Sequence, residues 1–123
     1  MSSRDFAGRN VLITGGTRGI GRATAKRLAE EGARVTVNYL SRKADADSLI
    51  AEIHDAGGKC AAVSGDVSQP EDAQRIVGAA REAFGPIDML VHCAAYSVVE
   101  PATDVTWESW KKTMNVNLDG TYN

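Results

Sequence analysis

Segments with the two-residue period of a β-strand alternate with segments of helical period along the whole of this 123-residue sequence. Because parallel strands need crossover connections, this alternation predicts a parallel sheet with helices on both faces. The expected class is α/β, doubly wound, with about four strands in the order 3-2-1-4. Strands are predicted at residues 9–14, 34–39, 60–64 and 87–92, and helices at 20–31, from 44 to the glycines at 57–58, from 68–71 to 85–86, and from 107 onward.

Local patterns predict where two helices begin and which side chains they bury. Ser68-Gln69-Pro70-Glu71 matches a capping box and predicts the start of the third helix, with Val77 on its buried face. Thr106 is expected to cap the last helix. Trp107 and Trp110 are three residues apart, a spacing that favours core packing over a substrate-binding role.

Composition and charge limit the possible partners. The sequence is 43% hydrophobic and 24% charged, which is typical of one compact domain over residues 1–123. Residues 1–62 carry ten Lys and Arg against seven Asp and Glu, whereas residues 63–123 carry four against nine, so an anion site is expected in the first half. We expect no nucleic-acid partner, membrane span or metal site. Two cysteines and no apolar leader favour the cytoplasm.

A glycine-rich segment lies between the first predicted strand and the first predicted helix. It reads Thr14-Gly15-Gly16-Thr17-Arg18-Gly19-Ile20-Gly21. Gly15 suits a tight turn, Gly19 leaves room for a diphosphate near the backbone, and Gly21 lets the helix pack close to the strand. The helix N-terminus adds free N–H groups and a partial positive charge. This segment therefore predicts a dinucleotide site rather than an empty turn.

The residues after the second predicted strand indicate which nucleotide is bound. An acidic residue there would hold the ribose 2′-hydroxyl of NAD, but residues 38–43 contain no carboxylate. Arg42, together with Arg18, suits a 2′-phosphate, because guanidinium groups bind phosphate through two parallel hydrogen bonds. NADP(H) is therefore favoured over NAD(H). The alternative is that Arg42 and Lys43 only form the solvated start of a helix.

With these motifs, the sequence resembles the N-terminal half of the short-chain dehydrogenase/reductase family. The glycine spacing at 14–21, Asp66-Val67 after the third strand and Val116-Asn117-Leu118-Asp119-Gly120 match that family's motifs. The likeness is greatest to NADPH-dependent 3-oxoacyl thioester reductases and implies a Rossmann-type fold. It implies Asn117, rather than Asn115, as a catalytic residue. The candidate cofactor-binding residues are Thr14, Gly15, Arg18, Gly19, Ile20, Gly21, Tyr39, Ser41, Arg42, Asp66, Val67, Cys93, Ala94 and Ala95.

The sequence departs from the family pattern in two places. His92-Cys93-Ala94-Ala95 stands where the family has Asn-Asn-Ala-Gly, and His92 is expected to replace the first asparagine as a hydrogen-bonding group. In the family, the catalytic Ser and the Tyr-x-x-x-Lys motif follow the Asn motif, and the 123 residues end before that region. The resemblance therefore implies the cofactor-binding part of an enzyme, with the C-terminal catalytic part absent and the chain alone inactive.

Several functional readings remain open on these residues. The first is an NADP(H)-dependent oxidoreductase that reduces a small-molecule carbonyl compound, with enoyl thioester reduction as an alternative within the family. The second is a nucleotide-binding half-domain without catalysis. A methyltransferase is disfavoured, because it would normally need an acidic residue near Tyr39. The open edge of the strand at 87–92 predicts self-association, and hence a homo-oligomer.

Overall fold

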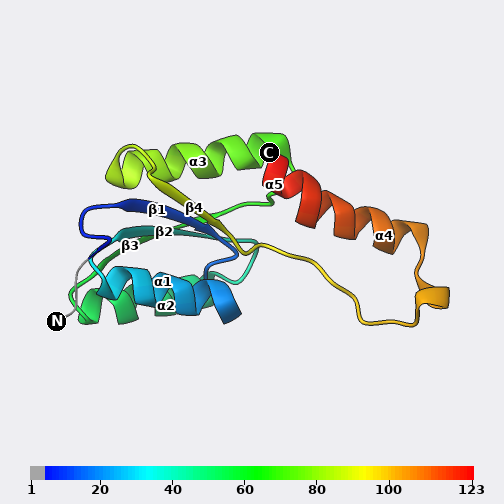
Figure 1. Cartoon of the computed structure of the whole chain (residues 1–123), viewed down its shortest axis with the longest axis horizontal. Coiled ribbons are helices and arrows are strands. Elements are labelled where there is room, and N and C mark those ends of the chain that lie inside the picture. Colours follow the sequence, from blue (N-terminus) through cyan, green and yellow to red (C-terminus); the bar gives the residue numbers. More distant parts are fainter. Residues whose placement is uncertain (1–4) are drawn as a thin grey trace.

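The computed structural model describes residues 5–123, which contain an open, parallel four-stranded sheet (Figure 1). The first four residues of the predicted domain lie outside the described residues. The strand order is β3-β2-β1-β4, as predicted from the sequence. Every predicted strand is present, with ends that differ by at most two residues. The strands are β1 (Asn10–Thr14), β2 (Arg34–Tyr39), β3 (Lys59–Ser64) and β4 (Met89–His92).

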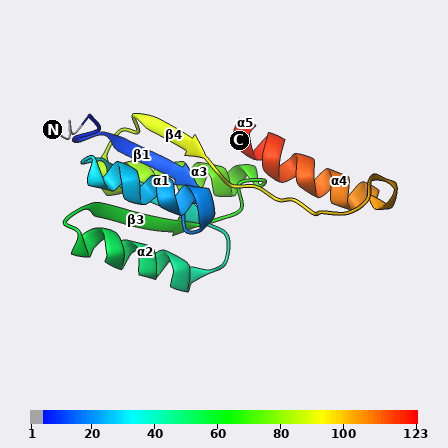
Figure 2. The same cartoon turned by 60° about the horizontal axis from the view of Figure 1, so that its bottom comes forward.

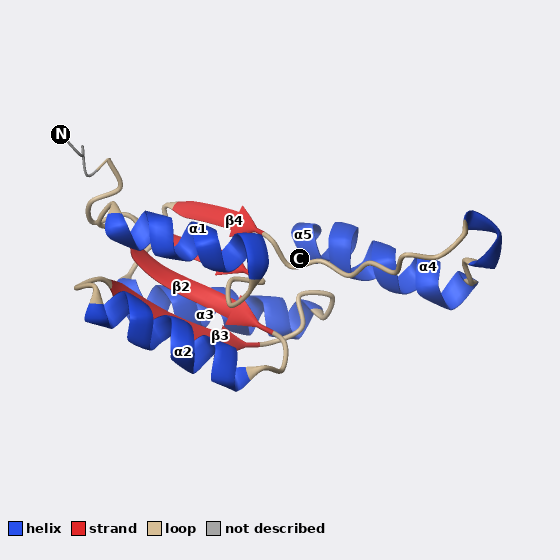
Figure 3. Ribbon diagram, turned by 90° about the horizontal axis from the view of Figure 1, so that it is seen from below, coloured by secondary structure: helices blue, strands red, loops and turns tan. Residues whose placement is uncertain are grey.

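Helices cover both faces of the sheet, which confirms the doubly wound architecture. Helices α1 (Gly19–Glu30) and α2 (Lys43–Asp55) lie on one face, and α3 (Pro70–Phe84) lies on the other (Figures 1 and 3). After β4 the chain forms the short 3-10 helix η1 (Ala102–Asp104). It ends with a helix built of three successive parts: α4 (Trp107–Met114), the π-helical turn η2 (Asn115–Asp119) and α5 (Gly120–Tyr122).

The central strand β1 is buried on both sides, as a parallel strand between two helical layers should be. Val11 and Ile13 pack into the larger core cluster, which α1 and α2 cover. Leu12, between them, points to the other face and packs with Ile76 and Ala80 of α3. Alternate residues of one strand thus anchor both layers.

The predicted capping box at the start of α3 is wrong. The N-cap is Gln69, whose side chain makes no capping hydrogen bond, and the hydroxyl of Ser68 donates instead to the Asp66 carboxylate at 2.7 Å. The reason is competition: Asp66, two residues earlier, binds Ser68 more locally than the helix does. Val77, expected on the buried face of α3, is exposed.

The two tryptophans of α4 are not core residues, which corrects the prediction from their spacing. Trp107 is 67% exposed and Trp110 is 51% exposed. The predicted cap is confirmed, because Thr106 Oγ1 accepts the backbone N–H of Ser109 at 3.1 Å. Figure 2 shows that α4 extends away from the sheet. Within residues 5–123, no second layer covers its apolar stripe, contrary to what the spacing implied.

The strand β4 is an edge of the described sheet, as predicted. It pairs with β1 alone, and Leu90 is 58% exposed. Within residues 5–123, none of the helices combines the length and the apolar character needed to cross a bilayer.

Candidate functional site

A cleft of about 390 Å³ opens at the carboxyl ends of the strands, where ligands bind in sheets of this class. Most of the candidate cofactor-binding residues line it: Gly15, Arg18, Gly19, Asp66, Val67, Cys93, Ala94 and Ala95. Six others do not: Thr14, Ile20, Gly21, Tyr39, Ser41 and Arg42. The sequence reasoning did not assign the remaining lining residues to the site: Asn38, Leu40, Gly65, Tyr96, Lys112 and Val116.

The glycine loop between β1 and α1 forms the floor of the cleft. Gly15 has φ of +58°, and a Cβ there would lie 2.8 Å from the backbone of Ala94. At Gly19, also with positive φ, a Cβ would meet open space. A Cβ at Gly21 would overlap the carbonyl oxygen of Gly15. Glycine thus permits the turn and the close packing of α1, while Gly19 leaves the helix N-terminus accessible.

The hydroxyl of Thr14 fastens the chain that leaves β4 to the end of β1. Its Oγ1 accepts the backbone N–H groups of Cys93 at 3.1 Å and Ala94 at 3.2 Å, and lies 2.7 Å from His92 Nδ1. Because both lone pairs of the oxygen are used, the hydroxyl proton points to Nδ1 and the ring proton belongs on Nε2. His92 therefore forms the hydrogen bond expected of it.

His92 is perturbed by its surroundings. Burial lowers the pKa of the ring below its usual value of 6.5, because desolvation disfavours the charged imidazolium. Its Nε2 is shielded from solvent and has no hydrogen-bond partner among the described residues. The neutral ring thus fits this position, whereas a second ring proton would disrupt the bond from Thr14.

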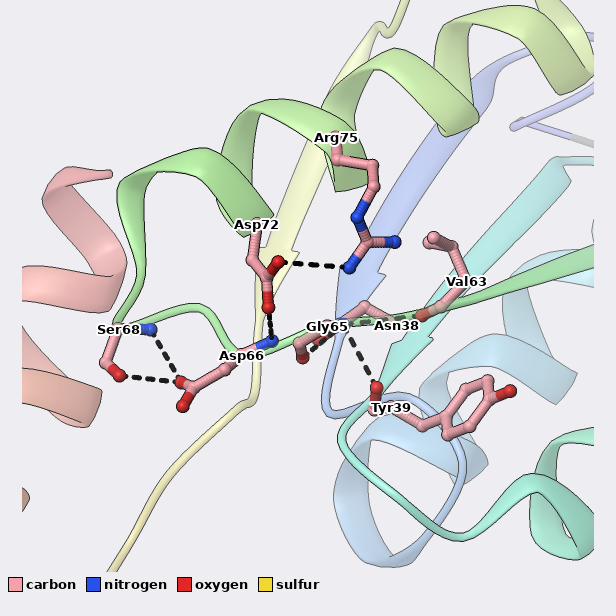
Figure 4. Close-up of polar contacts among 8 residues, drawn as sticks. All are labelled: Asn38, Tyr39, Val63, Gly65, Asp66, Ser68, Asp72 and Arg75. Carbon is pink, nitrogen blue, oxygen red and sulfur yellow. Dashed lines mark hydrogen bonds and ion pairs between the residues drawn. The ribbon is translucent and has the colours of Figure 1, made fainter.

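Asn38 joins the ends of three strands and was not identified from the sequence. It is 2% exposed, and its Oδ1 accepts the N–H of Gly15 at 3.4 Å. Its Nδ2 donates to the carbonyl of Gly65 at 3.1 Å (Figure 4). The signal available was an asparagine directly after the buried Val37 in an apolar strand. A buried amide there must find backbone partners.

The loop after β3 carries the predicted pair Asp66 and Val67. Asp66 Oδ1 accepts the N–H of Ser68 at 2.9 Å and its hydroxyl at 2.7 Å (Figure 4). The backbone N–H of Asp66 donates to the Asp72 carboxylate, which holds the pKa of Asp72 below its usual range with help from Arg75. These bonds fix the loop, so Asp66 and Val67 present a rigid wall to the cleft.

Arg18 and Arg42 come together as predicted, but both contact the carboxylate of Asp45. Arg42 Nε lies 2.9 Å from Asp45 Oδ2, and Arg18 Nε lies 4.0 Å from the same oxygen. The sequence reasoning overlooked Asp45, although a carboxylate three residues after Arg42 at a helix start is a recognisable pairing signal. The basic pair therefore carries an internal counter-charge.

Asn117 holds the loop that follows β4. Its Oδ1 accepts the N–H of Tyr96 at 2.8 Å and its Nδ2 donates to the carbonyl of Tyr96 at 2.9 Å. Asn117 itself is exposed. The ammonium of Lys112 lies 4.2 Å from the centre of the Tyr96 ring, a cation–π contact at the cleft.

Cys60 lies in the core and away from the residues that line the cleft. Cys60 is buried, and burial raises the pKa of its thiol to about 11, which keeps it protonated and unreactive at neutral pH. Residues 5–123 contain no cluster of three or more His, Cys, Asp or Glu side chains arranged to hold a metal ion.

The chain is similar in sequence to known oxidoreductases. The family model described as short chain dehydrogenase matches residues 9–123. The L-rhamnose 1-dehydrogenase (NAD(P)+) of a Sphingomonas species is 40% identical over 115 residues, which cover 94% of this chain and 45% of that protein.

Solved structures share the fold. A dehydrogenase/reductase from Sinorhizobium meliloti matches with a TM-score of 0.93 and 35% identity over 98% of this chain and 48% of that one. A short chain dehydrogenase from Burkholderia cenocepacia in complex with NADP matches with a TM-score of 0.90 and 35% identity, over 95% of this chain and 48% of that one. The chain thus spans about half the length of the proteins that it matches.

The close packing of α1 on the glycine loop can be tested by substitution. We expect Gly21→Ala to lower the free energy of unfolding by about 1–3 kcal/mol, because the new methyl group overlaps the Gly15 carbonyl. Gly78→Ala, in α3 with open space at its Cβ, should raise it by about 0.5–1 kcal/mol. Urea denaturation followed by far-UV circular dichroism measures both. A Gly21→Ala chain as stable as the original would contradict the packing argument.

The half-buried ring of His92 predicts a pH-dependent stability. Its pKa is lower in the folded chain, so unfolding takes up a proton, and stability present above about pH 6.5 is lost as the pH falls through the folded-state pKa. Melting temperatures should therefore drop between pH 7 and pH 5. His92→Asn should flatten this slope, whereas His54→Asn, at an exposed site on α2, should not. Identical slopes in all three chains would rule out the role of His92.

Proposed function

Because this chain belongs to the short chain dehydrogenase family, we propose that residues 1–123 form the NADP(H)-binding portion of an oxidoreductase that reduces a carbonyl group. One observation carries the proposal. The glycine loop, the accessible N-terminus of α1 and Arg18 all face one cleft at the carboxyl ends of the strands. That combination of shape and positive charge suits a dinucleotide.

The residues of the cleft fit the parts of a dinucleotide. The diphosphate belongs beside Gly15 and at Gly19, where the dipole of α1 and the backbone N–H groups of its first turn attract negative charge. Asp66 and Val67, on the fixed loop after β3, suit the adenosine part. Ala94, opposite the glycine loop, has a small side chain and leaves room for a ribose. We assign these contacts as part of the proposal.

The choice of NADP over NAD rests on Arg18 and Arg42. Their guanidinium groups converge at the start of α2, and guanidinium matches the geometry of a phosphate. The related chain from Burkholderia cenocepacia, solved with NADP, supports this choice. The carboxylate of Asp45 opposes it, so the preference depends on the balance between these charges.

The chemistry assigned to this chain is positioning. A bound nicotinamide supplies the hydride in such reactions. Asn117 holds the backbone of Tyr96, and Thr14 holds Cys93 and Ala94, so the loop beside the cleft stays in place. Tyr96 is followed four residues later by Glu100 rather than a lysine, and we propose that the proton donor lies outside residues 1–123. The chain alone then binds cofactor but does not turn over substrate.

The substrate class that we propose is a small carbonyl compound. By resemblance we propose a 3-oxoacyl thioester, with an enoyl thioester as the alternative within the family. A second candidate function is a nucleotide-binding half-domain without catalysis. It is favoured by one observation: residues between 15 and 116 form a cleft of about 390 Å³ without any further segment. We further propose that the protein acts in the cytoplasm.

Titration with NADPH tests the proposal. The 123-residue chain should bind NADPH saturably in calorimetry, and Gly19→Asp should weaken binding by about tenfold or more, because a carboxylate would meet the diphosphate. Gly57→Asp is the matched control, since Gly57 also has positive φ and open space at its Cβ but lies after α2. It should bind as the original chain does. Absence of saturable binding would overturn the proposal.

The open edge of β4 supports a further proposal, that copies of the chain associate. Edge strands with exposed apolar side chains pair readily, and lysine blocks such pairing. Light scattering should give a mass above 13.1 kDa that rises with concentration, and Leu90→Lys should lower it. Val77→Lys, on the outer face of α3, should change nothing. A monodisperse monomer at high concentration would contradict this proposal.

A further inference from the structure

Asp45 occupies the centre of the basic pair at the start of α2. Its Oδ2 lies 2.9 Å from Arg42 Nε and 4.0 Å from Arg18 Nε, and the side chain is 26% exposed. The same oxygen is shielded from solvent and accepts no well-aligned hydrogen bond. The contact is therefore an attraction between charges without the directional bonds that would make it hard to replace.

The other charged side chains near Asp45 pair with partners of their own, so Asp45, Arg18 and Arg42 form a separate group of charges. Lys43 pairs with Asp47 at 2.8 Å, and Arg22 pairs with Glu52 at 2.7 Å. Arg22 also donates to the backbone carbonyl of Asp45 at 3.0 Å and so holds its main chain in place. In the part of the chain that the structure describes, Arg18 and Arg42 have Asp45 as their carboxylate partner. Two guanidinium groups thus share one carboxylate, for a net charge of +1.

We propose that Asp45 sets the discrimination between NADP and NAD, by competing with the 2′-phosphate for Arg18 and Arg42. This inference rests on the proposed function. A phosphate monoester brings about 1.5 to 2 negative charges and needs the guanidinium edge that Asp45 now faces. It must displace or sit beside a carboxylate of like charge. The 2′-hydroxyl of NAD meets no such cost, so Asp45 narrows the preference for NADP that two arginines alone would give.

Nucleotide fragments test this directly. Dissociation constants of 2′,5′-ADP and 5′-AMP are measured by calorimetry on the 123-residue chain and on Asp45→Asn, which keeps the shape of the side chain and removes its charge. We expect 2′,5′-ADP to bind about fivefold more tightly to the variant, and 5′-AMP to change less than about twofold. Asp47→Asn, which removes a carboxylate two residues away that pairs with Lys43, should change neither.

Two kinds of result would contradict this role of Asp45. An unchanged ratio of the two constants, or weaker binding of 2′,5′-ADP to Asp45→Asn, overturns the inference, and weaker binding would show that Asp45 holds the arginines in a binding arrangement. If the original chain binds neither nucleotide, the proposed function fails, and this inference with it. Far-UV circular dichroism checks that Asp45→Asn folds. If it does not fold, Asp45→Ser is a second variant that removes the charge.

Discussion

The contact between the turn after β1 and the chain leaving β4 is the constraint on which the cleft depends. A Cβ on Gly15 would lie 2.8 Å from the backbone of Ala94, so the two segments touch along their main chains. The Thr14 hydroxyl then bonds Cys93, 79 residues later in the sequence. Because this contact fixes both walls at once, the first turn of α1 can present its N–H groups to a ligand without reorganising.

Polar side chains inside the sheet complete this arrangement at the cost of desolvation. Thr14, Asn38 and His92 are placed where strands end, and each bonds backbone or side-chain groups of a neighbouring strand. Buried polar groups stabilise a fold only when they are paired, so these bonds select one register and one path for the loops. The layer packing of Val11, Leu12 and Ile13 supplies the hydrophobic stabilisation, and the polar groups supply the shape of the site.

How far the sequence predicts the structure depends on the range of the interaction. Strand positions, their order and the glycine turn are predictable, because periodicity and local backbone geometry determine them. Trp107 and Trp110 are not, because spacing says that a helix has an apolar face but not whether another layer meets it. Ser68 shows a failure at short range, where a nearby carboxylate outcompetes the helix N-terminus. The contact between Asp45 and Arg18 could not be predicted from the sequence, because the two residues belong to different elements that only the fold brings together.

The π-helical turn η2 affects the direction in which a side chain leaves the helix. The N–H of Gly120 bonds the carbonyl of Asn115, five residues earlier rather than four. In an α-helix one residue corresponds to about 100° of rotation, so the widened turn alters the phase at which the amide of Asn117 emerges. The position of the Asn117 amide, and with it the path of the chain at Tyr96, therefore depends on the wider winding of this one helical turn.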